Sequence, residues 1–154
     1  MKNSIDIELQ IDPSVRETKV IILAERMTPE INNIIQAIEH TQDNAYPMVT
    51  GYDGDTVIPL SQREIIRVYL ESRRLIVRTD RGSFTARGTL GEMESILNAR
   101  RFLRISRSEI INLFKVSSFD FSLSGTIQVF FDDGSVSWVS RRYVRSIQKT
   151  LGIR

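Results

Sequence analysis

The stretch RFLRISRSEIIN, residues 101–112, places three arginines and two serines among apolar residues. Its apolar members Phe102, Leu103 and Ile105 suit a segment that is anchored in a small core. Guanidinium groups bind phosphates and guanine edges through paired hydrogen bonds. The residues of the stretch leave two interpretations open. The segment either presents arginines and hydroxyls to an anion, or it is an amphipathic turn with ordinary surface arginines.

Charge is unevenly distributed along the chain. Residues 1–60 contain 4 Lys/Arg and 10 Asp/Glu, a net charge of −6, whereas residues 61–154 contain 17 and 9, a net charge of +8; the two sums give the overall +2. A basic half built mainly from arginine is typical of proteins that bind nucleic acids. Membrane surfaces and acidic proteins would also attract it. A membrane surface is the weaker alternative, because the sequence has no lysine-rich amphipathic helix.

Length and composition bound the class of protein. The 154 residues, 41% of them hydrophobic, can bury the core of one domain or of two small ones. Without cysteine, disulfides and thiolate metal sites are excluded. No apolar run approaches the ~18 residues that span a bilayer, and the N-terminus does not resemble a signal peptide. We expect a soluble, cytoplasmic protein.

The acidic first part predicts a small ββαβ unit over residues 1–55. Residues 4–11 alternate between apolar and polar side chains, which indicates a half-buried strand, and residues 19–24 indicate a more deeply buried one. Thr28 and Pro29 are typical of a helix N-cap and first position. The apolar face of this helix contains Ile31, Ile34, Ile35 and Ile38. Residues 46–52 predict a third strand. We expect the unit to serve dimerisation or the docking of a partner.

From residue 56 onward the pattern predicts an α+β, mostly β fold. Short strands alternate with tight turns over residues 57–60, 64–70, 75–79, 83–87, 116–123, 126–131 and 135–139. Thr89 and Glu92 form a capping box that begins a short helix. Ser140 is expected to cap a final helix that extends to Thr150 and ends at Gly152.

The sequence contains few residues in patterns suited to catalysis. His40 is the single histidine, and its position at the end of a predicted helix favours a surface role. Asp132 and Asp133 are most simply turn residues, and the eight glycines form no phosphate-binding cradle. We therefore predict no enzyme activity, no metal, no cofactor and no small-molecule substrate.

Arginines occur in pairs at three turns or element ends of the basic half. They are Arg73-Arg74, Arg104 with Arg107, and Arg141-Arg142. Any one of these could be an ordinary solvated turn. Three of them in a segment with a net charge of +8 favour a binding surface for an anionic polymer.

Residues 57–153 resemble the LytTR DNA-binding domain of bacterial transcription regulators. The resemblance rests on FLRISRSEIIN at residues 102–112, on VFFDDG at 129–134 and on VSRRY at 139–143. The strand at 66–71 and the hairpin at 75–84 agree in order and spacing. The resemblance implies an elongated domain of small antiparallel sheets with short helices over residues 56–154. It also implies loops, rather than a recognition helix, that enter successive major grooves.

The resemblance also implies roles for particular residues. Base-reading positions fall on Arg73, Arg107 and Arg142. Backbone-contacting or supporting positions fall on Arg74, Arg104, Ser106, Ser108, Ser140 and Arg141. Asn112 matches an asparagine whose plainest role is structural.

The acidic part departs from the family's common pattern, because residues 1–55 are too short for a phosphorylatable receiver domain. The resemblance is therefore to a stand-alone regulator that binds double-stranded DNA, as a homodimer at least on the DNA. The resemblance to stand-alone members also implies a partner, a small membrane protein that holds the regulator inactive. The alternative is a protein-interaction module that docks its basic face on an acidic partner. RNA binding ranks third, because Phe84 and Phe102 suit the core better than base stacking.

Overall fold

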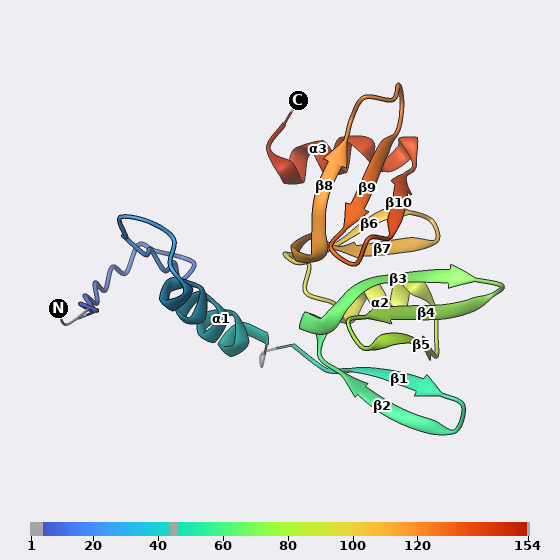
Figure 1. The fold of residues 1–154 in the computed structure, drawn as a ribbon, viewed down its shortest axis with the longest axis horizontal. Helices are drawn as coiled ribbons and strands as arrows, with labels where there is room; N and C mark the ends of the chain where they lie inside the picture. The colour runs from blue at the N-terminus through green and yellow to red at the C-terminus, as the bar shows by residue number, and fades with distance from the viewer. Residues whose placement is uncertain (1–4, 44–45, 154) are drawn as a thin grey trace.

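The computed structural model describes residues 5–43 and 46–153 (Figure 1). It comprises a seven-stranded sheet, a three-stranded sheet and short helices, and every strand pair is antiparallel. The predicted class, mostly β with small antiparallel sheets and short helices, is confirmed. Within the described residues no helix combines the length and the apolar character needed to cross a membrane.

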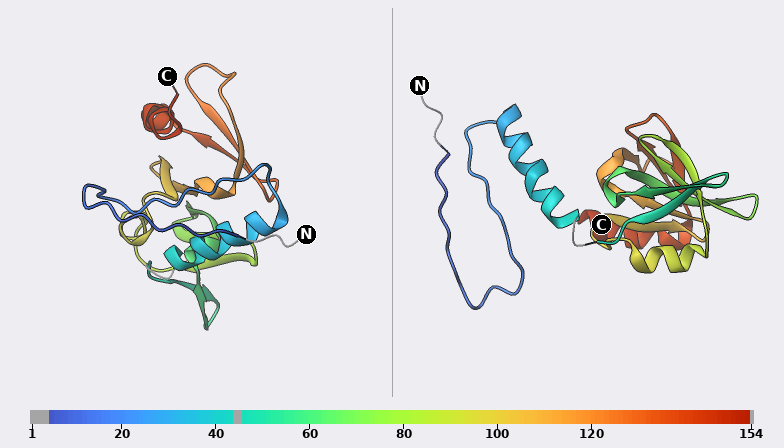
Figure 2. Two further views of the ribbon diagram at one scale, coloured as in Figure 1. Left: turned by 90° about the vertical axis from the view of Figure 1, so that its left-hand side faces the viewer. Right: turned by 90° about the horizontal axis from the view of Figure 1, so that it is seen from below.

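In the N-terminal part, the described residues form one helix, α1 (Pro29–Asp43). The Thr28 hydroxyl accepts a hydrogen bond from the N–H of Ile31 at 3.3 Å, so the predicted N-cap is confirmed. The predicted strand at 19–24 is wrong, as is the one at 4–11 over its described residues 5–11: both segments are extended but form no ladder. Figure 2 shows this stretch as an open loop whose returning arm lies beside α1.

The missing ladders have a physical reason. An alternating sequence gives a strand two different faces, but the strand forms only where a second backbone accepts and donates its hydrogen bonds. Neither segment meets such a partner among the described residues, and their apolar side chains stay exposed, for example Ile7 at 86% and Leu9 at 81%. The predicted ββαβ arrangement is therefore wrong. Its last strand, β1 (Val49–Asp53), pairs instead with β2 (Thr56–Leu60) and β5.

The large sheet has the strand order β2-β1-β5-β4-β3-β7-β6. Its remaining strands are β3 (Ile65–Glu71), β4 (Arg74–Thr79), β5 (Gly82–Ala86), β6 (Phe102–Ser106) and β7 (Glu109–Asn112). Helix α2 (Leu90–Ile96) packs Leu90 and Met93 against one face of this sheet, in a core with Val68 and Val77. The predicted N-cap of α2 is confirmed, since the Thr89 hydroxyl accepts a hydrogen bond from the N–H of Glu92 at 3.1 Å.

The small sheet has the order β10-β9-β8, formed by β8 (Val116–Asp120), β9 (Ile127–Phe131) and β10 (Val136–Val139). Helix α3 (Val144–Leu151) ends at Gly152, whose φ of 70° is left-handed, as the sequence predicted. The part of the chain that the structure describes also contains three short 3-10 helices: η1 (Gln62–Glu64), η2 (Leu113–Lys115) and η3 (Arg141–Tyr143). The second core lies between the two sheets and α3, and contains Ile105, Ile111, Val129 and Ile147.

Asn112 lies at the end of β7, where its side chain bonds to β3 and to η2. Its side-chain amide donates to the Ile65 carbonyl at 2.7 Å, and its side-chain oxygen accepts from the N–H of Phe114 at 3.0 Å. Because the side chain is fully buried, both bonds are protected from water. The predicted structural role of Asn112 is confirmed.

Candidate nucleic-acid interface

Three arginine-bearing connections project from one end of the molecule. They are the β3–β4 turn, the β6–β7 turn and the segment from β10 to α3, all on the right-hand side of Figure 1. The N-terminal segment and α1 lie at the opposite end in Figure 1 and in the right-hand view of Figure 2. The acidic part is therefore kept away from the arginine-rich connections.

The β3–β4 turn holds two residues in left-handed conformations. Ser72 and Arg73 have φ angles of 50° and 64°, between the register partners Glu71 and Arg74. Two-residue hairpin turns of this kind favour glycine and asparagine, and a left-handed residue with a side chain costs roughly 1–2 kcal/mol. The turn thus retains backbone strain while it projects an exposed Arg73 and Arg74.

The β6–β7 turn carries an exposed Arg107, and Arg104 holds this turn from inside. The Arg104 guanidinium donates to the Ser106 carbonyl at 2.8 Å, to the Arg107 carbonyl at 2.7 Å and to the Glu94 carboxylate at 2.9 Å. The Ser106 hydroxyl accepts from the N–H of Ser108 at 3.2 Å. Arg104 and Ser106 therefore act on the conformation of the turn itself.

The third connection begins at Ser140, which does not cap a helix as predicted. Its hydroxyl makes no capping bond and instead lies 3.4 Å from the Ile105 carbonyl, to which it donates. The N–H of Ser140 donates to the same carbonyl at 2.9 Å. Because that oxygen is within reach, the hydroxyl turns toward β6 rather than toward the helix. Arg141 and Arg142 follow on η3, and both are exposed.

Backbone hydrogen bonds join the three connections. The N–H of Leu70, at the end of β3, donates to the Ser108 carbonyl at 2.9 Å, and Ser140 is bonded to Ile105 on β6. Each turn is thereby fixed to its neighbour through main-chain atoms. The exposed arginines consequently project from one connected framework rather than from three independent loops.

Among the described residues, some of the arginines form ion pairs and others do not. Arg67, Arg78, Arg81 and Arg104 form ion pairs with Glu109, Asp133, Glu64 and Glu94. By contrast, the side chains of Arg73, Arg107 and Arg142 form no ion pair with any residue in the described part of the chain. Their charge is available to an external anion.

Sequence reasoning missed a polar joint between the two sheets. Arg67 on β3 donates to Glu109 on β7 at 3.1 Å, and the Ser137 hydroxyl on β10 donates to the other oxygen of the same carboxylate. The Arg67 guanidinium lies over the Tyr69 ring at 4.7 Å. Burial raises the pKa of Glu109, while Ser137 and Arg67 oppose that rise. The signal was a glutamate directly before two isoleucines in a strand next to the β6–β7 turn.

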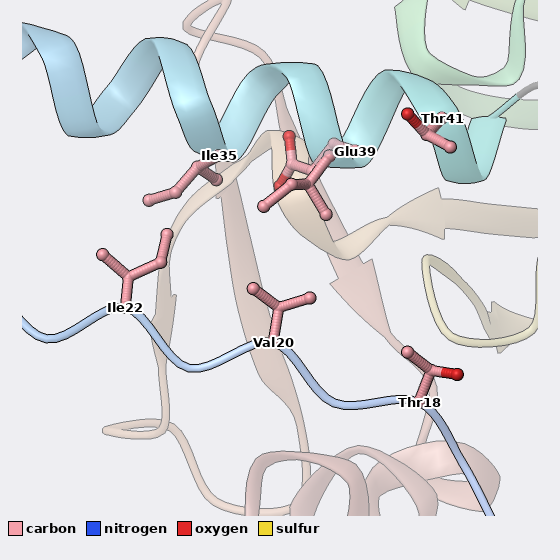
Figure 3. Close-up of a pocket in the computed structure, with 7 residues that line it drawn as sticks. Thr18, Val20, Ile22, Ile35, Glu39 and Thr41 are labelled. Carbon is pink, nitrogen blue, oxygen red and sulfur yellow. The ribbon is translucent and has the colours of Figure 1, made fainter. Parts of the chain in front are cut away.

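A separate apolar hollow of about 530 Å³ lies at the opposite end of the molecule. Figure 3 shows Val20 and Ile22 of the extended segment pointing toward Ile35 and Glu39 of α1. Its lining is apolar apart from Thr18, Glu39 and Thr41. The hollow therefore shares neither position nor chemistry with the arginine-rich connections.

Comparison with known proteins places the chain in a family. The family model of the LytTr DNA-binding domain matches residues 55–152 of the sequence. The chain therefore belongs to this family of DNA-binding domains. Two proteins of Staphylococcus aureus, from strains NCTC 8325 and COL, are each 26% identical to it over 96% of this chain and 98% of their own length. Both are named as uncharacterized HTH-type transcriptional regulators.

A solved structure has the same fold. It is the LytTr DNA-binding domain of a methyl-accepting/DNA response regulator from Bacillus cereus, with a TM-score of 0.67 and 24% identity. The match covers 70% of this chain and 98% of that one. The two sheets described above are thus the fold of this domain.

Proposed function

We propose that this protein is a sequence-specific transcriptional regulator of the bacterial cytoplasm that reads double-stranded DNA with arginine-bearing turns. The observation that carries the proposal is the set of three exposed arginines, Arg73, Arg107 and Arg142, on connections joined by backbone hydrogen bonds. Arginine reads guanine in the major groove by donating two hydrogen bonds to O6 and N7. Membership of the LytTr family supports the same conclusion.

The neighbouring polar residues have supporting roles in this proposal. Arg74, Ser108 and Arg141 are exposed beside the base-reading arginines and are assigned to the DNA backbone. Arg104 and Ser106 hold the central turn, and Ser140 holds the last one. Base contacts then give specificity, and phosphate contacts give position and affinity.

The test is a binding titration at several salt concentrations. A labelled duplex from the promoter of the protein's own operon is compared with a random duplex of equal length. DNA reading predicts a steep fall of affinity with salt and a preference of at least ~10³-fold for the specific duplex. Equal, weak binding to both duplexes would contradict the proposal and favour the alternative, in which the basic face docks on an acidic protein.

We further propose that the N-terminal part up to α1 docks on a second copy of the chain. Its extended segments expose Ile7, Leu9 and Leu23 at 81–91% and lack ladder partners among the described residues. A strand from a second copy would satisfy both the backbone and the apolar side chains. Two copies on DNA would double the arginine contacts. A small membrane inhibitor bound to the same segments is the other outcome of the test.

A further inference from the structure

A hollow of about 410 Å³ opens beside the β3–β4 turn, and three arginines line it. Arg73 and Arg74 come from the turn and the start of β4, and Arg87 comes from the segment that follows β5. Arg87 has no part in the roles described above. The hollow lies at the end of the molecule that carries the arginine-rich connections, because β5 ends where β4 begins (Figure 1).

The strand register sets two of these arginines against each other. Leu75 and Ala86 form the last pair of the β4–β5 ladder, and Arg74 and Arg87 are the next residues beyond that pair. Like charges at directly opposite positions are destabilising. Neither arginine forms an ion pair with a described residue, even though Glu71 is the register partner of Arg74 on β3. An anion between the two guanidinium groups would remove the repulsion.

Arg87 is already oriented in the absence of a ligand. Its guanidinium lies over the Tyr52 ring, 4.4 Å from the ring centroid, and Tyr52 belongs to β1 next to β5. A ring occupies one face of the planar group and leaves its N–H edge for an oxygen acceptor. Because the side chain is held before binding, less conformational entropy is lost when the anion arrives.

We propose that Arg74 and Arg87, with Tyr52 behind them, clamp one phosphate of the DNA backbone beside the base-reading Arg73. This inference rests on the proposed DNA-binding function. It adds one phosphate contact at a defined position, next to Arg73. The clamp would also fix the strained β3–β4 turn against the duplex. Arg87 is a phosphate-binding residue, whereas Tyr52 acts through Arg87 and is a positioning residue.

The test compares Arg87→Gln with Arg26→Gln in the full chain, on the promoter duplex and on a random duplex. Arg26 is exposed in the N-terminal part, so its replacement removes the same charge far from the clamp. Each phosphate that the protein neutralises adds about 0.9 to the slope of log affinity against log salt, so replacement of both Arg74 and Arg87 should lower the slope by about 0.9, and Arg87→Gln alone should lower it by less because Arg74 stays on the phosphate. The ratio of wild-type affinity to that of the variant lacking both arginines should therefore shrink about eightfold for a tenfold rise in salt. The loss should be equal on both duplexes, and Arg26→Gln should match the wild type.

Arg74→Gln and the double variant Arg74→Gln/Arg87→Gln test whether the phosphate is shared. Two arginines on one phosphate are coupled, so the double variant should lose less than the sum of the single losses. Additive losses would overturn the shared clamp. If the wild type prefers its promoter but the double variant keeps the wild-type salt slope, the inference fails while the proposed function stands. If the wild type shows no preference for the promoter duplex, the proposed function fails with it.

Discussion

The carbonyl oxygen of Ile105 accepts two hydrogen bonds from Ser140, one from its N–H at 2.9 Å and one from its hydroxyl at 3.4 Å. Ile105 is fully buried on β6, two residues before Arg107, and Ser140 lies two residues before Arg142. The contact therefore fixes the spacing between two of the proposed base-reading arginines. It also ties the small sheet to the large one.

Substitutions at Ser140 should separate its two hydrogen bonds. Ser140→Ala removes only the longer bond and should cost ~0.5 kcal/mol of unfolding free energy. Ser140→Pro suits the local φ of −70° but removes the N–H as well as the hydroxyl, so the Ile105 carbonyl loses both donors at a cost of ~1–3 kcal/mol, and the difference from Ser140→Ala reports the backbone bond. Chemical denaturation measures both. Equal effects of the two variants would show that the backbone bond does not hold the connection.

Arg107→Ala and Arg142→Ala should each weaken binding to the promoter duplex by ~1–3 kcal/mol, because each removes a pair of hydrogen bonds to a base. Both residues are exposed and make no internal ion pair with the described residues, so the melting temperature should stay unchanged. Arg73→Ala should act likewise, with a smaller loss if Arg74 replaces it. Fluorescence anisotropy at matched salt measures the affinity. A variant that binds like the wild type is excluded as a base reader.

Arg104→Ala should lower the stability of the protein rather than change the salt dependence of DNA binding. The guanidinium makes three hydrogen bonds to the β6–β7 turn and Glu94, and their loss should cost ~1–3 kcal/mol of unfolding free energy. Specific affinity should fall because the Arg107 turn loosens, but its salt slope should not. Arg104→Lys should not rescue the turn, since an ammonium cannot reproduce the planar fork. A reduced slope with unchanged stability would place Arg104 on a phosphate instead.

The stability of the wild type should fall relative to Glu109→Gln as pH rises. Burial raises the pKa of Glu109 above its ordinary 4.5, so the folded state binds the proton more strongly than the unfolded state. Between 4.5 and the folded-state pKa, each rise in pH therefore removes stability from the wild type. The variant cannot titrate at this position. Unfolding free energies of both proteins, measured across this pH range, test the direction of the change. A wild type that becomes more stable relative to Glu109→Gln as pH rises would contradict the prediction.

Removal of the N-terminal part should spare DNA binding and reduce self-association. A chain that begins at Tyr46 keeps β1, whose Val49 is buried in the core of the large sheet. It should melt like the full chain and bind a single DNA site, but sediment as a monomer. A chain that begins at Thr56 lacks β1 and should lose ~2 kcal/mol or more, because Val49 leaves that core. A Tyr46 chain that stays dimeric would exclude the N-terminal part as the docking unit.

Local sequence patterns predicted most of the strands and several helix ends from residue 57 onward. In β9, the alternation of Ile127, Val129 and Phe131 with half-buried residues follows directly from the period of two. Thr89 and Gly152 mark their helix ends because a cap needs only neighbouring residues. Arginines at turns could be recognised as exposed for the same reason.

Contacts between distant residues could not be predicted in this way. Residues 5–24 contain strand-like patterns, but a strand also needs a partner backbone, and the described chain supplies none. The Ser140 hydroxyl turned toward Ile105, and Arg67 toward Glu109, because the folded chain placed acceptors there. Local sequence thus determined which residues could form strands, turns and caps. The tertiary structure alone decided which backbones and charges met, since those partners lie far apart along the chain.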